Sequence, residues 1–262
     1  MMKKILSILL LMPCILFAWQ PVGAAPIDGP VAYFPFDGNA MDATGNGYDG
    51  TVMGGTFVAD RFGNPAGALS FDGVDDYVHF DDVLQPAVFT FATWFQTTQT
   101  SIGTIFSSDP DAWYGTNHGF SVRMVDGKAH VALDESPRAG TKVAVIESPF
   151  AVNDGQWHHL TTAFQFGNMY LYIDGVPVGS QGYVFNYSRT GSPMIMGMTR
   201  MEGGNNPWYF SGMLDDLEIY DYCLSPAEIH QISAVPEPAS LFLLGIGLVG
   251  IFGIPRRSRQ HR

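Results

Sequence analysis

The chain has 262 residues, with 13 Lys and Arg against 25 Asp and Glu, and a formal net charge of -12 at pH 7. This acidic balance argues against nucleic-acid binding, which needs a positively charged footprint. The 30 glycines, 17 prolines and 19 phenylalanines, with 15% charged residues, indicate short strands and tight turns instead of long helices.

Residues 1–24 have the three parts of a secretory signal peptide. Lys3 and Lys4 supply positive charge, an apolar run extends from Ile5 to Trp19, and small residues at 22–24 permit cleavage before Ala25. We therefore expect export through the inner membrane, and we expect residues 25–234 to form one folded domain.

Apolar and polar residues alternate at period two over residues 120–124 and 129–133, which is typical of half-buried strands. Asp126-Gly127 lies between these two segments, and both residue types tolerate positive φ, so the sequence predicts a hairpin there. Asp174-Gly175 follows a similar alternating segment. Many short strands joined by such turns predict an all-β antiparallel sandwich or jelly roll.

A series of short motifs rich in aromatic residues, glycine and aspartate runs along the predicted domain. In order they are Tyr33–Ala40, Asp42–Gly50, Asp60–Gly63, Leu69–Val78, Phe91–Phe95, Asp154–Leu160, Leu171–Gly175 and Phe210–Tyr220. From Val31 to Ile232 this order resembles the LamG-like family of concanavalin A-like jelly rolls. The resemblance implies a concanavalin A-like antiparallel β-sandwich, with polysaccharide or a surface glycan as the expected partner.

One short helix is predicted after the last strand. Ser225 is a suitable N-cap, Pro226 suits the first helical position, and Glu228 completes a capping box.

Calcium is the expected cofactor, because loop oxygens are the ligands that this ion prefers. The 37–50 segment supplies Asp37, Asp42, Asn46 and Asp49. Asp215 has the same strand parity as Leu217 and Ile219, which places it on the core side, where a carboxylate needs a partner or a metal. The family resemblance implies a structural calcium that bridges the first and last strands. The alternative is that these residues only form turns.

Two aromatic pairs are candidates for sugar stacking. Trp113-Tyr114 and Trp208-Tyr209 each lie in a loop-like segment beside asparagine residues. The alternative is that these aromatic residues cap the edges of the sandwich.

No catalytic residues are expected. The acidic strand with Asp215, Asp216, Glu218 and Asp221 lacks the Glu-x-Asp-x-x-Glu spacing of glucanases that share this fold, and a Gly-x-Ser-x-Gly motif is absent. The sequence therefore predicts a non-catalytic carbohydrate-binding or adhesion module. A glycoside hydrolase and a structural matrix protein without a specific ligand remain the alternatives.

Residues 235–262 form a tripartite tail. Pro236, Glu237 and Pro238 precede an apolar run from Ala239 to Ile254, and arginines follow. This pattern resembles the PEP-CTERM sorting signal. The resemblance implies an exosortase-type processing enzyme and the cell surface or biofilm matrix of a Gram-negative bacterium. The alternative is a permanent transmembrane helix, although about sixteen apolar residues are fewer than the roughly 20 that a spanning helix needs.

Overall fold

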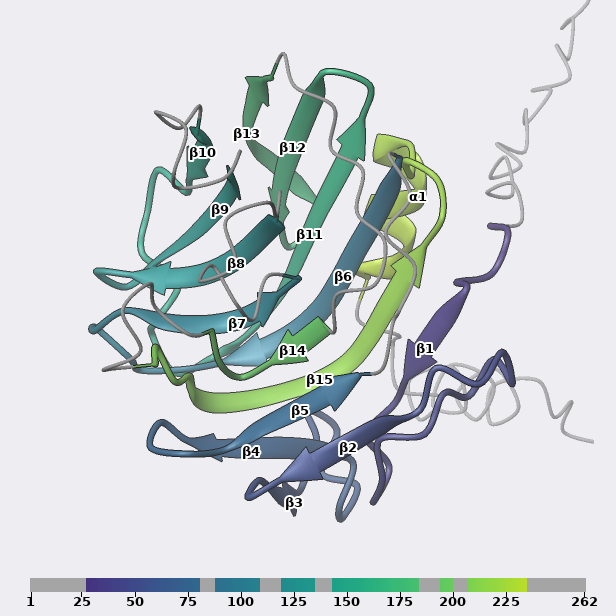
Figure 1. Cartoon of the computed structure of the whole chain (residues 1–262), viewed down its shortest axis with the longest axis vertical. Helices are drawn as coiled ribbons and strands as arrows, with labels where there is room; N and C mark the ends of the chain where they lie inside the picture. The colour runs from purple at the N-terminus through teal and green to yellow at the C-terminus, as the bar shows by residue number, and fades with distance from the viewer. Residues whose placement is uncertain are drawn as a thin grey trace, which may run out of the picture.

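The structure is a computed structural model that describes residues 27–80, 88–108, 119–134, 143–183, 194–199 and 207–234. Two antiparallel sheets, sheet A and sheet B, stack as a curved sandwich (Figure 1). The predicted all-β sandwich is confirmed. The predicted signal peptide and the C-terminal hydrophobic segment lie outside the described residues.

Sheet A has eight strands, of which seven follow the order β13-β12-β11-β6-β15-β4-β3. The first half of β15 pairs with β4 and its second half pairs with β1. The strands are β1 Ala32–Phe34, β3 Thr56–Val58, β4 Ala68–Asp72, β6 Phe89–Gln96, β11 Trp157–Gln165, β12 Asn168–Ile173, β13 Val176–Gly182 and β15 Ser211–Tyr220.

Sheet B has seven strands in the order β10-β9-β8-β7-β14-β5-β2. The strands are β2 Gly50–Met53, β5 Tyr77–Phe80, β7 Gly103–Ser107, β8 Gly119–Val125, β9 Lys128–Asp134, β10 Val143–Glu147 and β14 Met194–Met196.

Aromatic side chains fill the space between the sheets. Phe91 on β6 meets Phe106 on β7, with ring centroids 4.3 Å apart. Phe34 on β1 meets Phe80 on β5 at 4.7 Å. All four side chains are at most 1% exposed. Burying such rings contributes most of the free energy that holds two sheets together.

The predicted turns and helix are confirmed. Asp126 and Gly127 have φ values of 51° and 78°, and Asp174 and Gly175 have values of 52° and 74°. Positive φ at both central residues gives each hairpin a backbone twist that matches its strands.

Helix α1, Pro226–Ile232, has the predicted reciprocal capping box between Ser225 and Glu228. Its Ile229 packs with Tyr172 and Tyr220 in a second, smaller apolar cluster. In Figure 1 the helix lies beside β6 and β15.

Strand β15 contains an irregularity that the sequence pattern does not reveal. The register with β6 shifts between Asp215 and Glu218, and Asp216 adopts a φ of 46°. Because the bulge adds a residue, Leu214 and Leu217 both reach the core although they are three residues apart. The expected parity of Asp215 with Leu217 is therefore wrong, and Asp215 lies on the outer face of sheet A.

Candidate functional site

Asp42 anchors the 37–50 loop through hydrogen bonds to its carboxylate. Its Oδ1 accepts from the backbone N–H groups of Tyr33 and Thr44 and from the Thr44 hydroxyl, and its Oδ2 accepts from the Tyr48 N–H. Burial raises the pKa of Asp42, but the bonds from Thr44, Tyr33 and Tyr48 outweigh burial and lower it. These contacts account for an ionised carboxylate at this position.

The other predicted loop ligands also have roles in the turn. Asp49 Oδ1 accepts from the Asp42 N–H at 2.8 Å. Asn46 Nδ2 donates to the Val31 carbonyl at 3.0 Å. Asp37 is exposed. Across the residues that the structure describes, no three of the carboxylates of Asp37, Asp42, Asp49 and Asp215 gather within metal-binding reach of one another. The calcium site stays a prediction.

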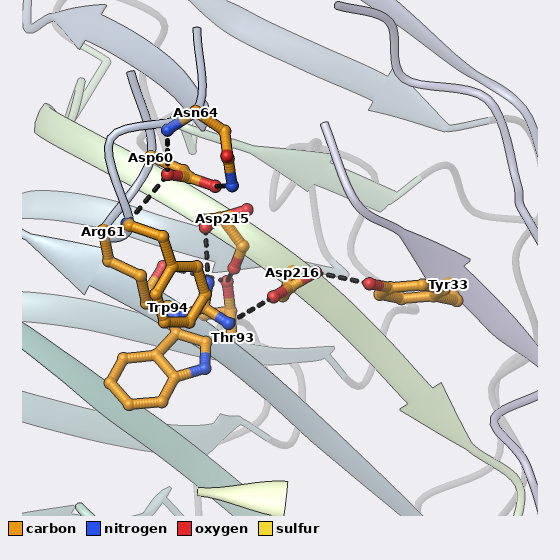
Figure 2. Close-up of polar contacts among 9 residues, drawn as sticks. Tyr33, Asp60, Arg61, Asn64, Thr93, Trp94, Asp215 and Asp216 are labelled. Atoms are coloured by element: carbon orange, nitrogen blue, oxygen red, sulfur yellow. Dashed lines mark hydrogen bonds and ion pairs between the residues drawn. The ribbon is translucent and has the colours of Figure 1, made fainter. Parts of the chain in front are cut away.

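Asp215 is paired with an arginine (Figure 2). Arg61, from the loop before β4, donates from Nη1 to Asp215 at 2.5 Å and from Nη2 to Asp216 at 2.6 Å. The Tyr33 hydroxyl donates to the other oxygen of Asp216. The guanidinium also lies 4.6 Å from the centre of the Trp94 ring. This network ties the loop, β1, β6 and β15 together on the outer face of sheet A.

The network holds more carboxylates than its single guanidinium can neutralise. Burial and the neighbouring Asp216 raise the pKa of Asp215 to about 7, although Arg61 acts in the opposite direction. Burial likewise raises the pKa of Glu218 to about 7, and that side chain accepts a hydrogen bond from Tyr220. Arg61 belongs to one of the sequence motifs, but its pairing with these carboxylates was not predicted.

Three other carboxylates do gather. Oxygens of Asp72, Asp75 and Asp76 lie within 4.8 Å of one another. Asp76 Oδ2 accepts from the Asp72 N–H, and Asp72 Oδ1 accepts from the Val74 N–H. These bonds shape the β4–β5 turn, so the cluster has a structural explanation.

Trp208 lies on the outer face of sheet B. Its carbonyl accepts from the Thr104 N–H at 3.1 Å, and its N–H donates to the Thr199 carbonyl at 3.0 Å. The Arg123 guanidinium lies 5.3 Å from the centre of the Trp208 ring. Both side chains are only partly exposed. The predicted aromatic residue is thus held against the sheet beside a cation.

Arg123 belongs to a line of polar residues that crosses four strands of sheet B. Thr104 on β7 pairs with Arg123 on β8, Arg123 pairs with His130 on β9, and His130 pairs with Glu147 on β10. Directly paired residues share one face of a sheet. Their sequence neighbours Val122, Met124, Ala129 and Val131 are in the core, so these side chains face outward. We call Thr104, Arg123, His130 and Glu147 the polar row.

The polar row was not predicted from the sequence. Arg123 and His130 alternate with core residues, which is the signal for outward-facing positions, but the pairing between strands cannot be read from that signal. Tyr209 lies next to Trp208 and is partly exposed. Trp113, Tyr114 and the sorting motif Pro236, Glu237 and Pro238 lie outside the described residues.

Two family profiles match the chain. Residues 72–230 match the concanavalin A-like lectin/glucanases superfamily profile named Laminin_G_3. Residues 234–257 match the PEP-CTERM protein-sorting motif, which points to export with a C-terminal anchor. Among the residues that the structure describes, none of the helices is long and apolar enough to cross a membrane.

Solved structures share the fold at low sequence identity. Domain 4 of AbnA, a GH43 extracellular arabinanase from Geobacillus stearothermophilus in complex with arabinotriose, has a TM-score of 0.62 and 22% identity, with 79% of this chain and 98% of that chain covered. A structure of botulinum neurotoxin type C, whose cell entry depends on two ganglioside molecules, has a TM-score of 0.60 and 12% identity, with 79% and 51% covered.

One curated relative is the adhesion G-protein coupled receptor V1 of Danio rerio. It is 26% identical over 165 residues, which is 59% of this chain and 2% of the receptor. The chain therefore spans a small fraction of this receptor and about half of the neurotoxin chain.

Proposed function

Because the chain belongs to the concanavalin A-like lectin/glucanases superfamily, we propose that it is an exported, non-catalytic protein that binds carbohydrate at the cell surface or in the exopolysaccharide matrix. The observation that carries this proposal is Trp208, which is held beside Arg123 on the outer face of sheet B. A partly exposed indole offers an apolar face to a sugar ring, and neighbouring polar groups serve its hydroxyls.

The structural neighbours support the same class of ligand. One of them is in complex with arabinotriose, and the other belongs to a toxin whose cell entry depends on gangliosides. Those ligands belong to the neighbours, and they support a glycan here without identifying it.

The sorting motif indicates export, and we propose in addition how the exported chain is processed. An exosortase-type enzyme of a Gram-negative bacterium would process the chain near Pro236, Glu237 and Pro238. The acidic domain would then remain on the outer side of the cell.

A glycan array on the exported protein tests the function, with Trp208→Ala as the variant. We expect the wild-type protein to bind a restricted set of glycans and the variant to lose about tenfold or more in affinity, as for an aromatic hot-spot residue. Trp157→Ala is the matched control, because Trp157 is also partly exposed but lies on β11 of sheet A.

A reducing-sugar assay on the bound glycans separates the alternatives. Turnover would favour the hydrolase. Absence of both binding and turnover would favour a structural matrix protein. A large fall in melting temperature for Trp208→Ala would assign Trp208 to capping the sandwich instead of binding.

A further inference from the structure

We infer that the chain, while its C-terminal segment anchors it, is held by a short tail with the α1 side of sheet A toward the membrane. We call helix α1, Tyr170, Tyr222 and the β12–β13 turn the α1 face. The outer face of sheet B, with Trp208, then points away from the membrane. The inference goes beyond the proposed function, and it rests on the anchor that the sorting motif indicates.

Helix α1 and sheet B lie on opposite sides of sheet A. Ile229 of α1 packs with Tyr172 and Tyr220 in the smaller apolar cluster. Their sequence neighbours Leu171 and Ile219 belong to the core between the two sheets. Because side chains alternate along a strand, both tyrosines point outward from sheet A. In Figure 1, α1 accordingly lies to the right of β6, whereas β8, β9 and β10 of sheet B lie to the left.

The tail that joins α1 to the anchor is short. The helix ends at Ile232, and Ser233 is packed against the β12–β13 turn, where a Cβ atom on Gly175 would clash with the Ser233 hydroxyl oxygen. The apolar run of the sorting signal begins at Ala239. Six steps of fully extended chain span at most about 21 Å. The anchor therefore enters the membrane close to the point where α1 ends.

This reach is smaller than the thickness of the molecule. Helix α1 forms a layer about 10 Å thick on sheet A, and the two sheets are about 10 Å apart. The outward side chains of sheet B add to this thickness. A tail of about 21 Å cannot pass around an edge of the sandwich and still reach a membrane on the far side. Sheet B is thus prevented from lying against the membrane that holds the anchor.

The start of the described chain lies on the same side. Ile27 packs against the cluster that contains Ile229. The Tyr222 hydroxyl donates to the Asp28 carbonyl at 2.8 Å. The predicted signal peptide would end only a few residues earlier, before Ala25. While it is attached, both membrane segments would join the domain on the α1 side of sheet A, which restricts rotation further.

The α1 face is acidic. The charges of Glu228, Asp28 and Asp221 act together with burial to raise the pKa of Tyr222, so the three carboxylates lie around that side chain. None of the lysines and arginines that the structure describes belongs to the α1 face. An anionic lipid surface repels such a face. The short tail, and not adhesion to lipid, is therefore what sets the orientation.

Energy transfer to a membrane surface tests this inference on the full chain. Cys14 and Cys223 are replaced by serine, and one cysteine at a time is introduced for a fluorophore by Gln231→Cys, Thr51→Cys or Val145→Cys. Each protein is reconstituted in vesicles of phosphatidylethanolamine and phosphatidylglycerol that carry rhodamine on some headgroups. Melting temperatures confirm that each variant is folded.

The three positions report on opposite faces of the molecule. Gln231 is exposed on α1, whereas Thr51 on β2 and Val145 on β10 are exposed on the outer face of sheet B, near its two edges. The helix layer and the two sheets place the last two positions about 20 Å further from the membrane. We expect transfer from position 231 to be stronger than transfer from positions 51 and 145 by about twofold or more.

A lengthened tail separates the tether from adhesion. Twenty Gly and Ser residues inserted after Ala234 add about 25 Å of flexible reach, so the three positions should become nearly equal. The same insertion after Ile254, on the far side of the apolar run, is the matched control and should leave the difference unchanged.

The outcomes decide the inference independently of the glycan. Equal transfer from the three positions in the chain with its natural tail, or stronger transfer from position 51 or 145, would overturn it. A difference that survives the insertion after Ala234 would also overturn it, since the tail would then not set the orientation. A negative glycan array removes the proposed function and leaves this orientation standing, and the reverse holds if only the energy transfer fails.

Discussion

At the scale of single residues, Arg61 is the most informative side chain on sheet A. It is a long cationic residue in a loop, and it reaches two carboxylates that the β15 bulge places side by side. From the sequence, Asp215 was proposed as a calcium ligand, and its pairing with Arg61 was not predicted. Pairing between residues 154 positions apart depends on where the loop lies on the sheet, which local pattern does not encode.

Replacing Arg61 by methionine keeps most of the side-chain volume but leaves two carboxylates without their counterion. Removing one partner of a buried ion pair costs about 3 kcal/mol or more, so we expect the free energy of unfolding to fall by about that amount. Urea denaturation measures the change.

Lys128→Met is the matched control for that experiment. Its pair with Glu147 is exposed on both sides, and solvent screens such a pair, so we expect a much smaller loss of stability than for the Arg61 variant. Equal effects of the two substitutions would contradict the assignment of Arg61 as a buried bridge.

The calcium prediction can be tested through the residues of the 37–50 loop. If Asp37, Asp42, Asn46 and Asp49 bind calcium with backbone carbonyls, EDTA should lower the melting temperature by several degrees, because a ligand that binds only the folded state stabilises it. Asp49→Asn should then abolish the EDTA effect. A melting curve that EDTA does not move would instead support the hydrogen-bonded turn seen around Asp42.

At the scale of elements, the sequence predicted a turn or a helix end correctly where a single short segment determines its own geometry. The two Asp-Gly hairpins and the Ser225 capping box are of this kind. The bulge in β15 was not foreseen, because Asp216 looks like any other strand residue until its neighbours in β6 are known. A single extra residue then reverses the parity on which the interpretation of Asp215 depended.

His158 connects three elements through two carboxylates. Its Nδ1 lies 2.9 Å from Asp174 in the β12–β13 turn, and its Nε2 lies 3.2 Å from Asp154 in the loop before β11. The hydrogen bond with Asp174 raises the pKa of His158 above its ordinary value of 6.5, and burial only partly offsets this effect. The protonated ring therefore clamps the start of β11 to the neighbouring turns.

A group whose pKa is higher in the folded protein stabilises it fully at pH values below its unfolded pKa, and this contribution is lost as the pH rises through the folded pKa. We expect His158→Gln to reduce stability at pH 5.5 by less than about 1 kcal/mol, since the pair is partly exposed, and by less still at pH 8.5. Denaturation of both proteins across this range measures the difference. Asp215 and Glu218 titrate equally in the wild-type protein and in the variant, so their contributions cancel in the difference. A difference in stability between the two proteins that grows with pH would contradict this stabilising role of protonated His158.

At the scale of the whole molecule, the sequence predicted the fold class because the ordered motifs and turns all point to the same sandwich. It could not predict the polar row. Thr104 and Glu147 belong to the same row only because β7, β8, β9 and β10 pair in one order and one register. The location of Trp208 above Arg123 depends in addition on the path of the chain after β14.

The sorting motif predicts a specific mature product. If the exosortase-type enzyme acts, mass spectrometry of the exported protein should find a chain that lacks the signal peptide and ends near residue 236, without the C-terminal arginines. Substituting Pro236 and Pro238 by alanine should retain the tail. A surface-exposed product that still ends at Arg262 would instead indicate a permanent anchor.

The position of β15 has a consequence for the timing of folding. This last strand occupies the interior of sheet A, between β6 and β4, and also pairs with β1, the first strand of the chain. A chain that emerges from a translocation channel amino terminus first cannot close its core until Tyr220 has passed through. The sorting motif begins at residue 234. If the tail pauses in the membrane, β15 has already left the channel and is free to pair within sheet A. The pause would then give the slow long-range pairing of this strand time to form before the chain is released.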